Sequence, residues 1–210
     1  MIRAYLQEAK PYTLNYLAHA WLSFLDPEIT VGNLISDFVK GKKKFDYPPG
    51  IQNGILLHRL IDSYTDNHPA TREAREIFRP AYRLYSGAFI DVVYDHFLAT
   101  DEQEFTEKTL LAFTQDAYAI LQNHASWLPP RFAGMFPYMR SQNWLFHYRQ
   151  RTGISRSMEG LVRRSAYMQE SATAYQLFEE HYQRLGDYYR QFWKDMRPFA
   201  LQQFEILKSA

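Results

Sequence analysis

The chain has 210 residues, of which 46% are hydrophobic and 17% aromatic, with a formal net charge of +1 at pH 7 and no cysteine. This composition predicts one folded domain with a large hydrophobic core. The small net charge disfavours a general nucleic-acid-binding protein. The lack of cysteine excludes disulfides, thiolate nucleophiles and cysteine-ligated metals, so any metal must be held by His, Asp or Glu, which favours Mn, Fe, Mg or Zn ions.

No apolar run in the sequence is long enough to span a bilayer. The apolar segment 14–25 contains Asn15 and His19 near its centre, which a secretory signal would not normally carry. We therefore interpret this segment as an amphipathic helix and expect a cytoplasmic protein.

Helical periodicity extends over almost the whole sequence, and prolines and glycines divide it into segments. The predicted helices cover residues 13–25, 31–40 and 51–64, a stretch that begins at Pro69, kinks or restarts at Pro80 and continues to Ala99, and then residues 106–124, 155–168 and 173–208. We expect residues 41–50 and 131–139 to be irregular and Pro198 to interrupt the last helix. The sequence shows no strand-like alternation, so the fold class predicted is an all-α, single-domain helical bundle.

The predicted helix 51–64 carries a stripe that changes from apolar to polar. Ile51, Ile55, His58 and Asp62 are spaced i, i+4, i+7 and i+11 and therefore share one face. A His–Asp pair one turn apart can direct two ligand atoms to the same metal ion. The alternative is a partly buried ion pair without a metal.

Three other predicted helices also place Asp or His beside apolar residues. His19 lies at the polar margin of the first helix, Asp37 follows Asn33 by one turn, and Asp95 precedes His96 within an apolar segment. Adjacent residues cannot point the same way, so one of the last two could bind a metal while the other orients it. Each residue alone could also be a hydrogen-bonded core residue or a surface carboxylate. Together the four helices favour a shared metal site, although the pattern is weaker than a His-Glu-x-x-His signature.

Five segments in the same order resemble the acyl carrier protein phosphodiesterase family. They are residues 15–19 (NYLAH), 32–41 (GNLISDFVKG), 58–67 (HRLIDSYTDN), 95–98 (DHFL) and 141–145 (SQNWL). The combination is specific, and the similarity extends from about residue 15 into the C-terminal helices. Residues 1–12 look like an extension before the family's usual start. We therefore divide the chain into an N-terminal extension, 1–12, and a helical phosphodiesterase domain, 13–210.

The resemblance implies an HD-like, cytoplasmic, manganese-dependent enzyme that removes the phosphopantetheine arm from holo-acyl carrier protein. It places the family's essential aspartate on Asp37. The order Asp95–His96 departs from the His–Asp order of the HD group, so which of the two contacts metal stays open. The metal ligands expected are His19, Asp37, His58, Asp62, Asp95 and His96, and the catalytic residues expected are Asp37 and His96.

Two basic clusters are candidates for docking the acidic carrier protein. One is an arginine stripe, which would be continuous if the helix persists across Pro80, and the other is a lysine cluster beside the Asp37 segment. Both could instead be solvated faces with surface ion pairs. The substrate-binding residues expected are Arg59, Asp66, Arg72, Arg75, Arg79, Lys42 and Lys43.

Two other functions stay open at this point. The first is an HD-like phosphohydrolase that acts on nucleotides or small phosphate esters, because its metal chemistry would be nearly identical. The second is a non-catalytic helical binding module, which would bind no divalent ion. The sequence defines neither the number of metal ions nor the oligomeric state.

Overall fold

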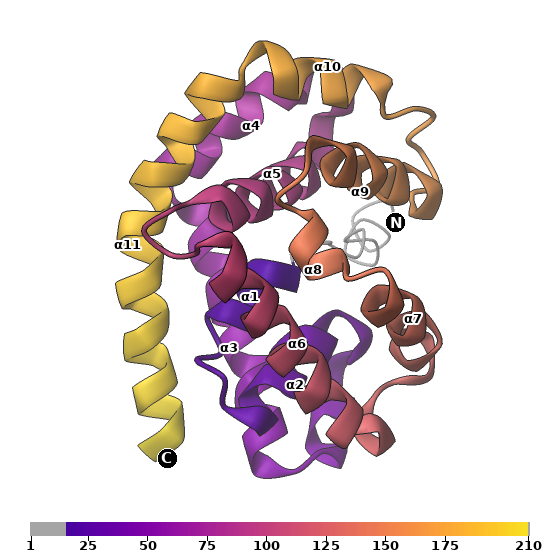
Figure 1. Ribbon diagram of the computed structural model, residues 1–210, viewed down its shortest axis with the longest axis vertical. Helices are drawn as coiled ribbons and strands as arrows, with labels where there is room; N and C mark the ends of the chain where they lie inside the picture. Colours follow the sequence, from indigo (N-terminus) through magenta and orange to yellow (C-terminus); the bar gives the residue numbers. More distant parts are fainter. Residues whose placement is uncertain (1–15, 210) are drawn as a thin grey trace, which may run out of the picture.

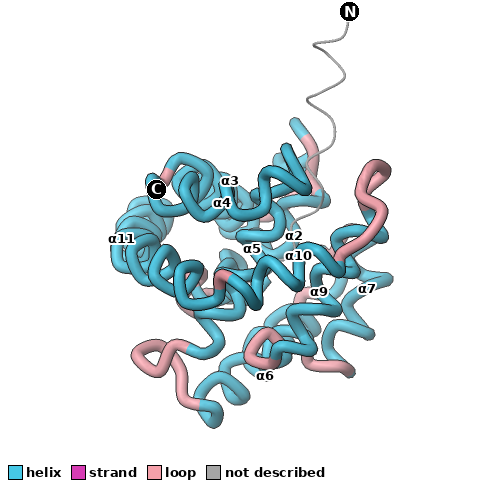
Figure 2. The backbone as a smooth tube through the Cα atoms, turned by 90° about the horizontal axis from the view of Figure 1, so that it is seen from above, coloured by secondary structure: helices cyan, strands magenta, loops and turns pink. Residues whose placement is uncertain are grey.

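The computed structural model describes residues 16–209 and consists of helices and turns, with no β-strand in that range (Figures 1 and 2). The predicted all-α, single-domain fold is confirmed. The extension 1–12 lies outside the described residues. The α-helices are α1 Tyr16–Trp21, α2 Pro27–Ile35, α3 Pro49–Asn67, α4 Pro69–Tyr82, α5 Ser86–Thr100, α6 Glu107–Asn123, α7 Pro130–Ser141, α8 Trp144–His147, α9 Arg151–Arg164, α10 Ala172–Glu180 and α11 Tyr182–Ser209.

Short 3₁₀ helices complete the connections: η2 Ser36–Phe38, η3 Gly41–Asp46, η4 Arg83–Tyr85 and η5 Ala125–Trp127. The long helix α11 runs along one side of the molecule and packs against α3, α4 and α5 (Figure 1). Helices α1 and α2 pack on each other and on α5 and α3, respectively, so the N-terminal helices lie within the bundle.

Local chemistry explains where the N-terminal helices begin and end. The Asp26 carboxylate accepts a hydrogen bond from the Ile29 N–H at 3.0 Å, and Pro27 fills the first position of α2, where a missing N–H costs nothing. Helix α3 ends at Asn67 because the next residue, His68, precedes Pro69 and adopts an extended conformation.

Helices α2 and α3 cross at two glycines whose backbones are in contact. A Cβ atom on Gly32 would lie 2.8 Å from the Gly54 Cα, and a Cβ atom on Gly54 would lie 2.3 Å from the Ile29 carbonyl oxygen. Neither position has room for a side chain. The crossing therefore brings the next residue of α2, Asn33, within reach of α3.

Several predicted boundaries are wrong. The first helix ends at Trp21, and Phe24 and Leu25 take positive φ values of 51° and 57° before α2 begins. Residues 131–139, expected to be irregular, lie within α7, which continues through Pro137. Burial of Phe132, Phe136 and Met139 offsets the missing hydrogen bond there.

Two further prolines lie inside helices rather than between them. Helix α4 continues through Pro80 to Tyr82, so it does not restart there. The last predicted helix is divided at His181, between α10 and α11, whereas Pro198 lies within α11.

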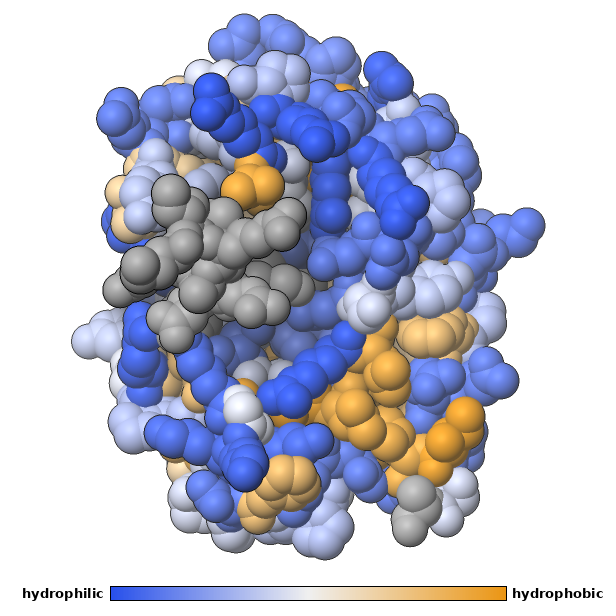
Figure 3. Space-filling model, turned by 180° about the vertical axis from the view of Figure 1, so that it is seen from behind, coloured by the Kyte–Doolittle hydropathy of each residue, from blue (hydrophilic) through white to orange (hydrophobic). Residues whose placement is uncertain are grey.

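The face shown in Figure 3 is mainly hydrophilic, with one larger apolar area. None of the described helices combines the length and the hydropathy that crossing a bilayer requires.

Candidate metal centre

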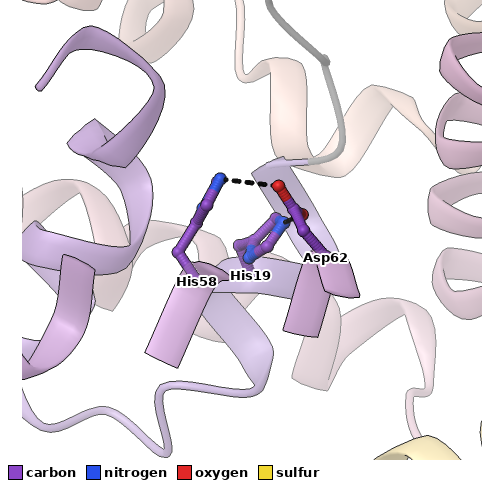
Figure 4. Close-up of side chains that lie close together, drawn as sticks. All are labelled: His19, His58 and Asp62. Carbon is purple, nitrogen blue, oxygen red and sulfur yellow. Dashed lines mark ion pairs between the residues drawn. The ribbon is translucent and has the colours of Figure 1, made fainter. Parts of the chain in front are cut away.

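Side chains from α1 and α3 converge between these helices (Figure 4), and Asp37 from η2 joins them. His19 Nε2 lies 3.3 Å from Asp62 Oδ1, and His58 Nε2 lies 3.3 Å from Asp62 Oδ2. Asp37 Oδ1 lies 3.4 Å from the same His58 nitrogen. The two imidazole rings are stacked, with centroids 4.0 Å apart. We name these four residues the His–Asp cluster.

Asn33 fixes the orientation of both histidines. Its side-chain amide donates to the His19 carbonyl at 2.9 Å and to Ser23 Oγ at 3.0 Å, which leaves Oδ1 to accept a hydrogen bond from His19 Nδ1 at 2.7 Å. Its backbone carbonyl accepts a hydrogen bond from His58 Nδ1 at 2.7 Å. Both Nδ1 atoms therefore carry the proton, and in each neutral ring the Nε2 lone pair faces the carboxylates. This arrangement is typical of metal-ligating histidines.

The Nε2 atoms of His19 and His58 are buried and have no hydrogen-bond partner within the described residues. Buried nitrogens are rarely left unsatisfied, so these two donor atoms are candidates to bind a cation. The ligand atoms of His19, His58 and Asp62 all lie within 4.8 Å of one another. Neighbouring ligands around an ion with bonds of about 2.1 Å are about 3.0–3.5 Å apart in octahedral or tetrahedral geometry, which fits the separations of 3.3–3.4 Å.

The electrostatics of the cluster also favour a bound cation. Burial alone would lower the pKa of His58, but the carboxylates of Asp62 and Asp37 outweigh burial and raise it to about 10. Burial and the neighbouring His58 lower the pKa of His19. For Asp62, burial opposes ionisation, but the two histidines hold the carboxyl pKa well below its usual value. The space between His58 and the carboxylates therefore attracts a positive charge, whether a proton or a metal ion.

The structure does not bring Asp95 and His96 into this cluster. Asp95 is fully buried, and its two oxygens accept hydrogen bonds from the backbone N–H groups of Leu17 and Ala18 at 3.0 and 2.8 Å. Burial raises the pKa of Asp95 well above its usual value despite these two donors. The geometry makes Asp95 an anchor for the start of α1, the helix that carries His19.

His96 uses both of its ring nitrogens within the protein. Nδ1 donates to the Tyr148 carbonyl at 2.8 Å, and Nε2 accepts from the Tyr182 hydroxyl at 2.9 Å. Burial lowers the pKa of His96, although the Tyr148 carbonyl opposes this effect. Metal ligation by Asp95 or His96, or catalysis by His96, would require these contacts to break. These roles therefore stay predictions.

The expected substrate-binding residues divide into three places. Arg59 donates to the Val39 carbonyl at 3.2 Å and so braces the chain just after η2, which carries Asp37. Lys42 and Lys43 are exposed on η3. The remaining residues are on or next to α4 and line a cavity that begins at Asp62: Asp66, Arg72, Arg75 and Arg79.

Asn33 and Ser23 are the site residues that sequence reasoning missed. In the sequence, Asn33 stands out by its spacing to Asp37 and as an amide within an otherwise apolar helix. Ser23 donates to the His19 carbonyl at 2.7 Å, and only the three-dimensional contact reveals this role.

The fold and the site together define an α-helical protein with a candidate divalent-metal centre. The sequence matches the acyl carrier protein phosphodiesterase family over residues 14–196. It is 36% identical over 184 residues to the acyl carrier protein phosphodiesterase of Yersinia pestis, covering 87% of this chain and 95% of that protein. It is 35% identical over 188 residues to that of Klebsiella pneumoniae subsp. pneumoniae, covering 89% and 97%.

The chain therefore belongs to the acyl carrier protein phosphodiesterase family, a family of hydrolases. No solved structure matches it with statistical significance.

Proposed function

We propose that this protein is a divalent-metal-dependent hydrolase that cleaves the phosphodiester between 4′-phosphopantetheine and the serine of holo-acyl carrier protein. The observation that carries the metal dependence is the pair of buried, unpartnered Nε2 atoms that face two carboxylates. The names of the similar proteins supply the substrate. Mn²⁺ is the ion proposed, because the family resemblance implies it and the nitrogen and oxygen donors suit it.

The protein's own residues would hold and orient the ion. His19, His58 and Asp62 are the ligands proposed, Asp37 completes the set, and Asn33 keeps both imidazoles in the ligating tautomer. A bound divalent ion supplies Lewis-acid polarisation of the phosphoryl oxygens and lowers the pKa of a water molecule. The reaction adds water across the phosphorus–oxygen bond to serine, so that serine regains its hydroxyl and the phosphate leaves with the pantetheine arm.

The lysines on η3 are the docking residues proposed for the carrier protein. Lys42 and Lys43 are exposed and directly follow η2, which carries Asp37. Positive charges at this place would attract an acidic protein surface and position its modified serine near the cluster. The proposal also locates the reaction in the cytoplasm, as the family resemblance implies.

Mass spectrometry of holo-acyl carrier protein after incubation with the protein and Mn²⁺ tests the proposal. We expect the carrier to lose the mass of 4′-phosphopantetheine with the wild type and with Asp46→Ala, a control at an exposed aspartate of η3. We expect no loss with Asp37→Ala or after removal of metal with a chelator. An unchanged carrier mass with the wild type, together with turnover of a nucleotide or a small phosphate ester, would contradict the substrate proposed.

A further inference from the structure

A cavity of 570 Å³ opens directly beside the His–Asp cluster. Asp62 forms part of its wall, and the rest comes from the end of α3, one face of α4, and the chain from η4 into α5. The volume lies within the range of about 300–1,000 Å³ that is usual for small-molecule sites. Arg72 and Arg79 in its wall are seven residues apart on α4, which corresponds to about 10 Å along the helix.

The wall of the cavity carries charged residues of both signs. Four arginines, Arg72, Arg75, Arg79 and Arg83, are matched by four carboxylates, Asp62, Asp66, Glu76 and Asp91. Ion pairs join Arg75 to Asp66 and Arg79 to Glu76. The formal charges of the wall cancel, so the cavity has no net positive charge that would attract anions in general. Closely spaced donors and acceptors instead suit a neutral chain that contains both amide N–H and carbonyl groups.

Arg75 is fixed against the floor of the cavity. Its guanidinium lies over Gly87, where an added Cβ atom would stand 3.0 Å from Nη2 and 3.2 Å from Cζ. One nitrogen of the group bonds to Asp66, and Nε is buried without a hydrogen-bond partner within the described residues. Gly87, near the start of α5, thus makes room for the Arg75 guanidinium. The Nε–H donor of this guanidinium is not used within the described residues.

The rim of the cavity is held in an unusual conformation. Arg83 has φ 47°, which is rare for a residue other than glycine, and it directly precedes Leu84, whose side chain is 87% exposed at the cavity. Backbone strain of this kind often occurs at functional sites. The exposed Leu84 adds an apolar contact at the rim of a cavity of mixed polarity.

We propose that this cavity binds the pantetheine arm of the substrate, with the phosphate at the Asp62 end and the amide groups along Arg75 and its neighbours. This assignment rests on the function proposed above, because that reaction leaves the phosphate attached to the arm. The arm carries two amides, a hydroxyl and a terminal thiol on an aliphatic chain, so it matches a cavity of mixed polarity and zero formal charge. The same cavity then binds the product, 4′-phosphopantetheine.

Filling the cavity from Gly87 tests the assignment. The probes are free 4′-phosphopantetheine and inorganic phosphate, each measured as an inhibitor of the Mn²⁺-loaded protein acting on holo-acyl carrier protein. We expect Gly87→Leu to weaken inhibition by 4′-phosphopantetheine at least about tenfold, since a filled cavity loses the contacts of the arm. Inhibition by inorganic phosphate, which needs only the Asp62 end, stays unchanged.

The matched control is Gly134→Leu, because Gly134 also lies in a helix and a Cβ atom there meets no atom within 4 Å among the described residues. Its inhibition constants should equal those of the wild type. A second variant, Arg75→Gln, removes the guanidinium without adding volume and should weaken 4′-phosphopantetheine inhibition about tenfold. Thermal unfolding and Mn²⁺ affinity of each variant check that the fold and the cluster are intact.

Two outcomes would overturn the assignment. If both variants hydrolyse holo-carrier protein and 4′-phosphopantetheine inhibits them as it does the wild type, the arm binds elsewhere. If KM for holo-carrier protein rises while inhibition by the free arm is unchanged, the arginines contact the carrier protein itself. A wild type that leaves holo-carrier protein intact would instead contradict the function proposed, and direct calorimetric binding of 4′-phosphopantetheine would still decide whether the cavity takes this ligand.

Discussion

The protein buries two groups of histidine and aspartate residues that differ in how their polar atoms are satisfied. In the His–Asp cluster, two imidazole nitrogens have no hydrogen-bond partner and face carboxylates. In the Asp95–His96 pair, backbone N–H groups, a backbone carbonyl and a tyrosine hydroxyl satisfy both side chains. Residue types are the same in both groups and all three histidines are buried, so the unsatisfied nitrogens are what distinguish a candidate metal centre from a structural contact.

The largest effect is expected from Asp62→Asn, because this residue faces both histidines. The substitution removes the charge that holds a cation between them, and we expect Mn²⁺ affinity and turnover of holo-carrier protein to fall about a thousand-fold. Mn²⁺ titration followed by electron paramagnetic resonance measures the affinity. Asp91→Asn, in the neighbouring cavity wall, is the control for Mn²⁺ affinity alone, since it removes a nearby carboxylate that is not a proposed ligand. Unchanged affinity in Asp62→Asn would place the ion elsewhere.

A smaller loss is expected from Asn33→Leu, which removes no proposed ligand but frees the His19 ring. The Nδ1 proton of His19 then loses its acceptor, and the ring is no longer held in the ligating tautomer. Changes to such supporting residues typically cost about 10–100-fold in metal affinity. The same titration measures the loss. An affinity equal to that of the wild type would show that Asn33 only packs.

The pH dependence of Mn²⁺ binding tests whether His58 is a ligand. The charge of Asp62 and Asp37 raises the pKa of His58 to about 10 against burial, so an ion must displace a proton from this residue. Apparent Mn²⁺ affinity should therefore fall about tenfold for each pH unit below this pKa. Calorimetry in buffers of different ionisation enthalpy should detect one proton released per ion at pH 7. Release of none would show that His58 is not a ligand.

A rise in pH should increase Mn²⁺ affinity but lower the stability of the metal-free protein. A pKa raised from 6.5 to about 10 means that the folded state binds the proton more tightly than the unfolded state. The stabilisation is complete below pH 6.5 and is lost as pH rises through about 10. Urea unfolding of the chelator-treated protein at pH 6, 8 and 10 measures this trend, and it should be absent in His58→Ala.

The smallest effect on metal binding is expected from the Asp95–His96 pair. Asp95→Ala leaves two buried N–H groups of α1 unpaired and should lower the free energy of unfolding by about 2 kcal/mol, with less than a tenfold loss of Mn²⁺ affinity through His19. His96→Phe should lower stability by about 1–2 kcal/mol and leave the affinity unchanged. Urea unfolding and Mn²⁺ titration separate the two quantities. A loss of affinity as large as that of Asp62→Asn would identify either residue as a ligand.

Local spacing explains which parts of the site were predictable from sequence. The face shared by Ile51, Ile55, His58 and Asp62 depends only on helix geometry, and the structure places His58 and Asp62 together as expected. Asp95 and His96 satisfied the same sequence criteria, but their partners are far away in the chain. The hydrogen bonds of Asp95 join residues 77 and 78 positions apart, and those of His96 join residues 52 and 86 positions apart. No local pattern contains that information.

The fold also depends in part on contacts that local sequence patterns do not contain. The all-α fold follows from periodicity, whereas the helix at residues 130–141 depends on aromatic residues that pack against the core despite Pro137. The arginine stripe was predicted from spacing alone, yet only the structure shows that these residues line a cavity beside Asp62.

The contact between Gly32 and Gly54 sets the spacing of the proposed metal ligands, although neither glycine is a ligand. His19 is fixed to α2 through Asn33, whereas His58 and Asp62 belong to α3, so the separation of these two helices fixes the separation of the donor atoms. A methyl group at Gly54 would meet the Ile29 carbonyl oxygen at 2.3 Å and would force the helices apart. The preference among divalent ions would then move from small ions, with bonds of about 2.1 Å, toward Ca²⁺, with bonds of about 2.4 Å. Two residues that have no side chain thus set the spacing of the proposed ligand atoms.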